Sequence, residues 1–253
     1  HSGGTRPRAP DVAMTARLCT ATLERLPVAV RRPRYDRSAI ECGIVHIGPG
    51  AFHRVHQAWY AEQWLATDRR WGIAGVSLRS GALRDALAAQ DGLYTLAIVD
   101  QAQAFAVIGS LRAVLVAADD PAAALQRVAR SEARLLTLTV TEKGYCRDVD
   151  GRLDLAHPAI RHDLQHPRQP RSAIGYVVEG LRLRRERGLP PLPVMSCDNL
   201  AGNGRLLSAA VRGLAGAVDP SLAAWIAAEV TFPCTMVDSI TPATTSELRA
   251  RVA

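Results

Sequence analysis

The chain has 253 residues, enough to bury a sizeable core, and its 48% hydrophobic and 22% charged residues are ordinary for a soluble globular protein. No apolar run approaches the roughly 18 residues that span a membrane. The formal charge of +7 comes from scattered arginines with few aromatic residues, which argues against nucleic-acid binding. We therefore expect neither a nucleic-acid nor a membrane partner.

The five cysteines are far apart and include no Cys-x-x-Cys pair. An odd number of dispersed cysteines is typical of free thiols in a reducing compartment, so we expect a cytoplasmic protein. The missing pair also argues against a structural zinc site, and we predict no metal.

Hydrophobic periodicity and turn residues predict one α/β domain over residues 14–253, preceded by a Gly/Pro/Arg-rich segment, 1–13, that we interpret as a disordered or tag-like terminus. Strands alternate with helices, which favours a doubly wound, mostly parallel sheet. The expected helices cover 14–26, 51–66, 80–89, 121–130, 176–187, 203–214 and 220–228. The expected strands cover 43–48, 72–78, 135–141 and 194–197, with an antiparallel pair at 93–99 and 105–111 that turns near Asp100.

The most informative segment joins the first strand of this pattern to the helix that follows it. Three β-formers, ending at Ile47, run into Gly48-Pro49-Gly50, and Ala51-Phe52 then begin a helix-compatible run. Such a strand, glycine turn and helix hold a dinucleotide diphosphate, because glycines let the backbone approach the phosphates. The third glycine of the usual pattern is absent, since His53 occupies its place. The turn alone therefore leaves open a false match or a variant loop.

The end of the second strand, Ser77 to Ala82, contains no acidic residue to hydrogen-bond an adenosine ribose. Arg79 and Ser80 stand there instead, and both residue types suit a 2′-phosphate. The alternative is that Arg79 is a surface residue and Ser80 a helix cap. The residues alone leave NAD against NADP open.

Two later strands also end in polar residues, at the edge where an open α/β sheet binds its ligand. Glu142 follows one buried strand, where its carboxylate can steer protons or serve only as a cap. Asn199 follows another, where its amide can donate to a carbonyl or alkoxide oxygen. Asp198 and Asn203 beside it are alternatively helix caps. His53, His56 and Gln57 share one helix face and are interpreted as packed, hydrogen-bonded side chains.

Taken together, these segments resemble the mannitol dehydrogenase family of long-chain polyol dehydrogenases, which includes mannitol 2-dehydrogenase and the fructuronate reductases. The stretches that carry the resemblance run in the family's order, almost to the end of the chain. They are Tyr35-Asp36-Arg37-Ser38, 44–58, Gln90-Asp91-Gly92-Leu93-Tyr94-Thr95-Leu96, 139–146, Leu153-Asp154-Leu155-Ala156-His157-Pro158, 194–204 and 230–245.

The resemblance implies a zinc-independent oxidoreductase that transfers hydride between NAD(H) and a polyol/ketose pair such as mannitol and fructose. It implies an NAD-binding Rossmann-like core with Gly48, Gly50 and Phe52 around the cofactor. Together with the position of Arg79 after the second strand, this predicts a cofactor site of Ile47, Gly48, Pro49, Gly50, Ala51, Phe52 and Arg79. It assigns Asn199 to polarising the substrate oxygen, Glu142 to the mouth of the active site, and Asn199 with Asp238 to substrate binding. NADP is not excluded.

The chain departs from the family at Cys234 and Ser239, where asparagine and arginine are usual. Family members continue into a helical catalytic domain with a Lys-x-x-x-x-Asn-x-x-His signature whose lysine is the general base. Lys143 is the only lysine here and lies outside such a motif. We therefore interpret the chain as the cofactor-binding half of such an enzyme, with the missing catalytic domain as its partner. The alternative is an NAD(H)-binding module, truncated or decayed, without activity of its own.

Overall fold

The computed structural model describes residues 17–99, 104–237 and 240–252. Five strands form one parallel sheet in the order β5-β2-β1-β6-β7. Two further strands, β3 (Tyr94–Ile98) and β4 (Ala104–Ile108), form an antiparallel hairpin. The sheet strands are β1 (Ile44–Ile47), β2 (Ile73–Ser77), β5 (Leu111–Val116), β6 (Leu135–Leu138) and β7 (Val194–Ser196).

The strand order places a topological switch point beside β1. After β1 the chain builds outward through β2 and β5, and it then returns to the other side of β1 for β6 and β7. Ile47 at the end of β1 is in register with Val76 on β2 and Leu138 on β6, so the carboxyl ends of the strands lie at one edge. In open α/β sheets the ligand crevice forms outside this edge, at the switch point.

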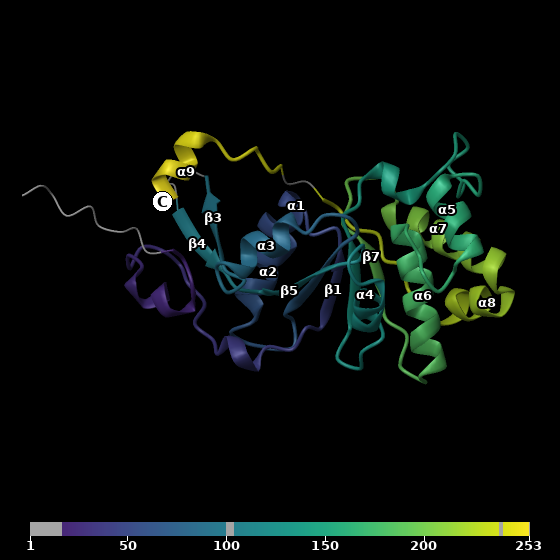
Figure 1. The fold of residues 1–253 in the computed structure, drawn as a ribbon, viewed down its shortest axis with the longest axis horizontal. Coiled ribbons are helices and arrows are strands. Elements are labelled where there is room, and N and C mark those ends of the chain that lie inside the picture. Colours follow the sequence, from purple (N-terminus) through teal and green to yellow (C-terminus); the bar gives the residue numbers. More distant parts are fainter. Residues whose placement is uncertain (1–16, 100–103, 238–239, 253) are drawn as a thin grey trace, which may run out of the picture.

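Helices cover both faces of the sheet, as the predicted doubly wound fold requires (Figure 1). Successive side chains of β1 point to opposite faces. Val45 and Ile47 therefore join the core under α4, α6 and α7, whereas Ile44 joins the core under α2 and α3. The helices are α1 (Ala51–Val55), α2 (Gln57–Trp64), α3 (Ala82–Ala88), α4 (Pro121–Val128), α5 (Pro158–Gln165), α6 (Ala173–Glu186), α7 (Asn203–Val218), α8 (Pro220–Glu229) and α9 (Ser246–Val252).

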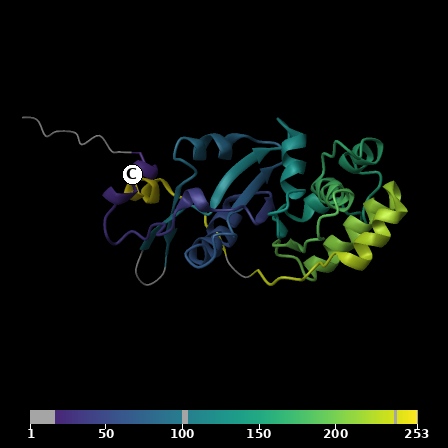
Figure 2. The same cartoon turned by 90° about the horizontal axis from the view of Figure 1, so that it is seen from below.

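Polar caps fix where several helices begin. Asp120 accepts a hydrogen bond from Ala123 N at 2.8 Å, as predicted for the start of α4. Asp219 accepts from Ser221 N at 2.9 Å at the start of α8. After α8 the chain runs back across the molecule toward the side that carries the β3–β4 hairpin (Figures 1 and 2).

Several local predictions are wrong. The helix expected over 51–66 is broken at His56, whose φ of −108° and ψ of −90° interrupt it between α1 and α2. Described residues of 14–26 form a short 3₁₀ helix, Thr20–Arg25. Helix α3 begins after Gly81, two residues later than expected, although the Ser80 hydroxyl still accepts from Ala82 N. Strand β5 and helices α5 and α9 were not expected. The segment 1–13 and the turn at Asp100 lie outside the described residues.

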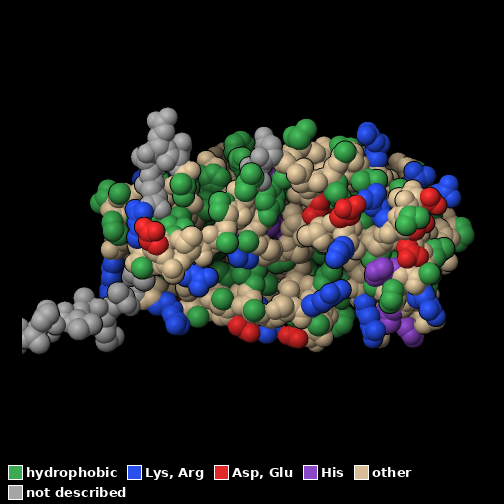
Figure 3. Space-filling view, turned by 90° about the horizontal axis from the view of Figure 1, so that it is seen from above, with side chains coloured by type: hydrophobic (Ala, Val, Ile, Leu, Met, Phe, Trp, Pro, Cys, Tyr) green, Lys and Arg blue, Asp and Glu red, His purple; other side chains and the backbone are tan. Residues whose placement is uncertain are grey.

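The arginines behave differently from one another. On the face shown in Figure 3, basic side chains are scattered with acidic ones among them. Arg184 on α6 differs from these surface residues, because only 2% of it is exposed. Its guanidinium donates to the carbonyl oxygens of Val128, Arg130 and Pro190, so it ties α6 to the end of α4.

Within the described ranges no helix is long and apolar enough to cross a membrane.

Candidate functional site

The turn after β1 is wedged into the switch point of the sheet. Gly48 has a φ of +87°, and a Cβ on it would lie 2.2 Å from the carbonyl oxygen of Thr139 at the end of β6. Only glycine fits there, because any side chain would strain the backbone at this positive φ and would clash with the Thr139 carbonyl oxygen. Gly48 N donates to Val76 O at 3.0 Å, and Gly50 N donates back to Gly48 O at 2.6 Å. The predicted sequence of strand, glycine turn and helix is thus confirmed.

The residues of the turn divide into an inner and an outer set. Ile47 and Pro49 are buried, and Pro49 packs against Gly75 of β2, where a Cβ would come within 3.1 Å of the proline ring. Gly50 and Ala51 are exposed, and Phe52 is half-buried. The outer side of Gly50 is open, since an added Cβ would meet only Gly48 O, at 3.8 Å. This bare backbone is the part that a ligand can approach.

A buried polar network supports the turn from the α2 side of the sheet. His46 of β1 is fully buried, and its Nδ1 lies 2.7 Å from Thr137 Oγ1 while its Nε2 lies 2.8 Å from Thr139 Oγ1. The Thr139 hydroxyl donates to Gly48 O at 2.7 Å, and the Thr137 hydroxyl contacts Gln57 Oε1 at 3.0 Å. Burial lowers the pKa of His46 to about 3, so the ring is neutral.

His53 occupies the position where the usual fingerprint has its third glycine. Its ring is fully buried and stacks on His46, with centroids 3.6 Å apart and an interplanar angle of 19°. Neither of its nitrogens has a hydrogen-bond partner among the described residues. Burial, followed by the charge of its neighbours, holds the pKa of His53 well below its usual range. His53 is packed as predicted, but the predicted hydrogen bonding of this residue is wrong, because its ring is buried against the ring of His46 on β1.

Asp198 joins the ends of β6 and β7. Its carboxylate accepts from Val140 N at 3.1 Å, from Thr141 N at 2.9 Å and from the Tyr145 hydroxyl at 2.8 Å. Burial raises the pKa of Tyr145, which therefore stays a donor. Thr141 has a φ of +64°, a left-handed conformation that a β-branched residue adopts only when its surroundings impose it. Asp198 thus fixes a strained corner.

This corner brings the predicted Glu142 and Asn199 to neighbouring positions. Each follows one partner of the hydrogen-bonded pair Thr141 and Asp198 in the chain. Both are exposed, and Glu142 forms an ion pair with Arg147 at 3.0 Å. Asn203 is buried instead, and its amide hydrogen-bonds Asp198 O and Thr235, which makes it a structural tie. The role of Asp198 in joining the two strand ends was not predicted from the sequence, because its hydrogen-bond partners are distant in the chain.

The remaining predicted residues are Arg79 and Asp238. Arg79 is exposed just after β2, and no carboxylate stands within Ser77 to Ala82. Two acids from other positions, Asp85 and Asp119, form ion pairs with Arg84 at 2.9 Å and 2.5 Å. Asp238 is not among the described residues. No group of three or more histidine, cysteine, aspartate or glutamate side chains in the described part of the chain is arranged to hold a metal ion.

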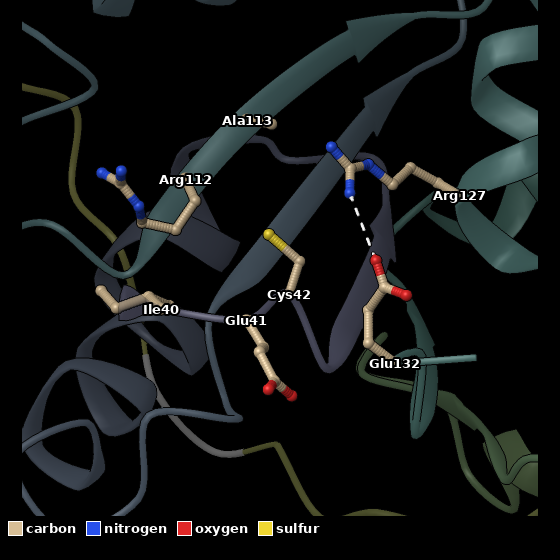
Figure 4. Close-up of a pocket in the computed structure, with 7 residues that line it drawn as sticks. All are labelled: Ile40, Glu41, Cys42, Arg112, Ala113, Arg127 and Glu132. Carbon is tan, nitrogen blue, oxygen red and sulfur yellow. Dashed lines mark ion pairs between the residues drawn. The ribbon is translucent and has the colours of Figure 1, made fainter. Parts of the chain in front are cut away.

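A cavity of about 470 Å³ lies at the opposite edge of the sheet (Figure 4). Cys42 before β1, Arg112 near the start of β5 and Glu132 before β6 surround it. Glu132 forms an ion pair with Arg127 at 3.9 Å, whereas Arg112 points away from that pair (Figure 4). Because the cavity borders the amino ends of the strands, it is separate from the glycine turn, which lies at their carboxyl ends.

A parallel sheet of this order, with a glycine turn at its switch point, defines a Rossmann-type domain. Residues 42–253 match the family described as the mannitol dehydrogenase Rossmann domain, and the chain belongs to that family. The resemblance found in the sequence is thereby confirmed.

The relatives agree with this assignment. D-mannonate oxidoreductase of Escherichia coli (strain K12) is 49% identical over 93% of this chain, and mannitol 2-dehydrogenase of Cereibacter sphaeroides is 45% identical over 85%. Among solved structures, mannitol 2-dehydrogenase of Pseudomonas fluorescens, in a ternary complex with NAD and D-mannitol, is 39% identical over 94% of this chain, with a TM-score of 0.89. The chain spans about half the length of these relatives.

Proposed function

We propose that this chain binds NAD(H) at the Gly48–Gly50 turn, as the cofactor half of an oxidoreductase. The observation that carries the proposal is the exposed backbone at Gly50, where an added Cβ would meet only Gly48 O, at 3.8 Å. A diphosphate needs such a bare backbone at the switch point. The Pseudomonas fluorescens relative, whose structure contains NAD, supports the same group.

The reaction that fits this family is hydride transfer between NAD(H) and a secondary alcohol of a polyol or a sugar acid. Both substrate classes occur among the names of the relatives, which include D-mannonate oxidoreductase and mannitol 2-dehydrogenase. The nicotinamide would supply or accept the hydride. In this chain, the exposed Asn199 amide would donate a hydrogen bond to the substrate oxygen, and Glu142 would stand at the mouth of the site. Asp238 remains a proposed substrate contact.

Oxidation of an alcohol also needs a general base that accepts the hydroxyl proton, and this chain lacks the lysine signature that supplies it in the family. Lys143, the only lysine, is followed by no Asn-x-x-His at the required spacing. Because general base and electrostatic catalysis are each worth about 10² to 10⁴ in rate, we expect the 253 residues alone to bind the cofactor with little turnover. We propose that the base comes from a second half of the kind that the longer relatives contain.

The cofactor form is proposed as NAD(H), with NADP(H) as the competing form. The Pseudomonas fluorescens structure supports NAD, whereas a Gluconobacter oxydans relative, 42% identical, is named polyol:NADP oxidoreductase. Arg79 is the exposed residue after β2 that would meet a 2′-phosphate. Parallel titrations with NADH and NADPH would decide between them through the ratio of the two dissociation constants.

Gly50→Ala tests the site without disturbing the fold. A methyl group at Gly50 meets nothing closer than 3.8 Å in the protein, but it would occupy the space of the diphosphate. We expect the melting temperature to stay within a few degrees and the Kd for NADH, measured by fluorescence titration, to rise about tenfold or more. That change corresponds to about 1.4 kcal/mol of lost binding free energy.

Gly216→Ala is the matched control. Gly216 lies on the exposed side of α7, and an added Cβ would meet only Ala223 Cβ at 3.8 Å. Alanine there should leave NADH binding unchanged and stabilise the helix by about 0.8–1 kcal/mol. NADH affinity that is the same in both variants would rule out the Gly48–Gly50 turn as the cofactor site.

A further inference from the structure

Thr137 of β6 and Thr139, which directly follows that strand, contact opposite nitrogens of the same buried imidazole. Thr137 lies 2.7 Å from His46 Nδ1, and Thr139 lies 2.8 Å from His46 Nε2. They are two residues apart, and both side chains reach the face of the sheet that carries His46. The two hydroxyls differ in what they contact next: Thr137 contacts the side chain of Gln57, and Thr139 contacts the backbone of the glycine turn.

The contact with the turn is made at the Gly48 carbonyl. This oxygen lies 2.7 Å from Thr139 Oγ1, 3.2 Å from His46 Nε2 and 2.6 Å from Gly50 N. A carbonyl oxygen can only accept, so Thr139 and His46 hold it from the protein side while Gly50 N–H holds it from within the turn. The position of this oxygen fixes the plane of the peptide group between Gly48 and Pro49, and therefore where the exposed backbone of Gly50 stands.

We infer that Thr139 is a positioning residue that sets the Gly48–Gly50 turn for its dinucleotide, with His46 as its support. The stacked ring of His53 keeps His46 in place from the other side, at 3.6 Å between centroids. Where the usual glycine pattern has its third glycine, this chain thus has His53, whose side chain supports the hydrogen-bonded His46. The inference rests on the proposed cofactor function, which it deepens by naming the residue that presents the turn.

The test compares Thr139→Val with Thr137→Val in the whole chain. Each change removes one hydroxyl and one hydrogen bond to His46 without altering side-chain shape. Thr137 is fully buried and Thr139 is half-buried, so Thr137→Val should cause the larger loss of stability. NADH affinity should change in the opposite order. We expect the Kd to rise about tenfold in Thr139→Val and less than twofold in Thr137→Val.

This crossed pattern separates positioning from a general loss of structure, because a merely structural role would make affinity follow stability. Thr139→Ser retains the hydroxyl and should bind NADH within about twofold of the unchanged chain. It also serves if Thr139→Val fails to fold, since a serine variant that folds but binds as weakly as a Gly50→Ala variant would overturn the inference.

Three outcomes contradict the inference. Equal NADH affinities of Thr139→Val and Thr137→Val would remove the special role of Thr139, and so would weak binding by Thr139→Ser. In both cases the unchanged chain still binds NADH, and the proposed function stands. If the unchanged, folded chain does not bind NADH, the proposed function fails and the inference fails with it.

Discussion

At the scale of single residues, two stacked histidines under the glycine turn have opposite environments. Both nitrogens of His46 are hydrogen-bonded, whereas neither nitrogen of His53 has a partner among the described residues. The glycine turn itself could be read from the sequence, because Gly-x-Gly after a β-rich run is a local pattern. The role of His53 could not, because it depends on a contact with β1 that no local pattern reports.

This difference predicts opposite effects of the same substitution. His53→Phe keeps an aromatic ring against His46 and removes two unpartnered polar atoms, so we expect an unfolding free energy unchanged or about 1 kcal/mol higher. His46→Phe leaves the Thr137 and Thr139 hydroxyls without their ring partner and should cost about 1–3 kcal/mol. Denaturant unfolding measures both, and a His53→Phe protein less stable than His46→Phe would contradict this assignment.

The same pair predicts how stability depends on pH. In the folded chain the pKa values of His46 and His53 lie below the ordinary value of 6.5. Below pH 6.5 the unfolded chain therefore binds protons that the folded chain does not, so falling pH favours unfolding. Each histidine contributes a slope that approaches about 1.4 kcal/mol per pH unit. The stability that these two histidines contribute is fully present above pH 6.5.

His53→Phe isolates one of these contributions, since the carboxyl groups and the neighbouring Arg54 and His56 are common to both proteins. Between pH 6 and pH 5, the unfolding free energy of the variant should fall less steeply than that of the unchanged chain. The difference between the two slopes should be about 1 to 1.4 kcal/mol per pH unit. Parallel slopes for the two proteins in urea titrations would mean that His53 is protonated in the folded chain.

At the scale of elements, the parallel sheet could be predicted from the alternation of strand and helix patterns. The elements that were predicted wrongly depend on contacts between residues distant in the chain. Strand β5 was missed because 105–116 is almost continuously apolar, and the chain leaves the β3–β4 hairpin only at Gly109 and Ser110. Buried Glu62 accepts from Gly109 N at 2.7 Å, and Ser110 donates to Ala58 O at 2.7 Å. The break at His56 likewise has no glycine or proline to signal it.

The joint between β6 and β7 is the element-scale feature on which the site depends. Asp198→Asn leaves a single acceptor oxygen for the three donors Val140 N, Thr141 N and Tyr145 OH. We expect the unfolding free energy to fall by about 1.5–3 kcal/mol, as for lost hydrogen bonds to a charged group. Asp219→Asn is the control, because asparagine caps a helix as well as aspartate does. Equal losses in the two variants would argue against the joint.

At the scale of the whole molecule, the chain is a Rossmann domain of the mannitol dehydrogenase family that spans about half the length of its relatives. The strand order creates a switch point, the glycine turn lies beside it, and the Asp198 corner presents Glu142 and Asn199 at the same edge of the sheet. The family and fold could be predicted from the sequence because their motifs are contiguous. The residues that support the site could not, because His46, Thr139 and Asp198 act through partners that are distant in the chain.

The most direct test is titration of the purified, folded chain with NADH, followed by cofactor fluorescence and by calorimetry. If the Gly48–Gly50 turn holds the cofactor, binding will be saturable with one NADH per chain, and Gly50→Ala will weaken it while Gly216→Ala will not. Absence of NADH and NADPH binding by a chain whose cooperative unfolding shows it to be folded would contradict the cofactor function.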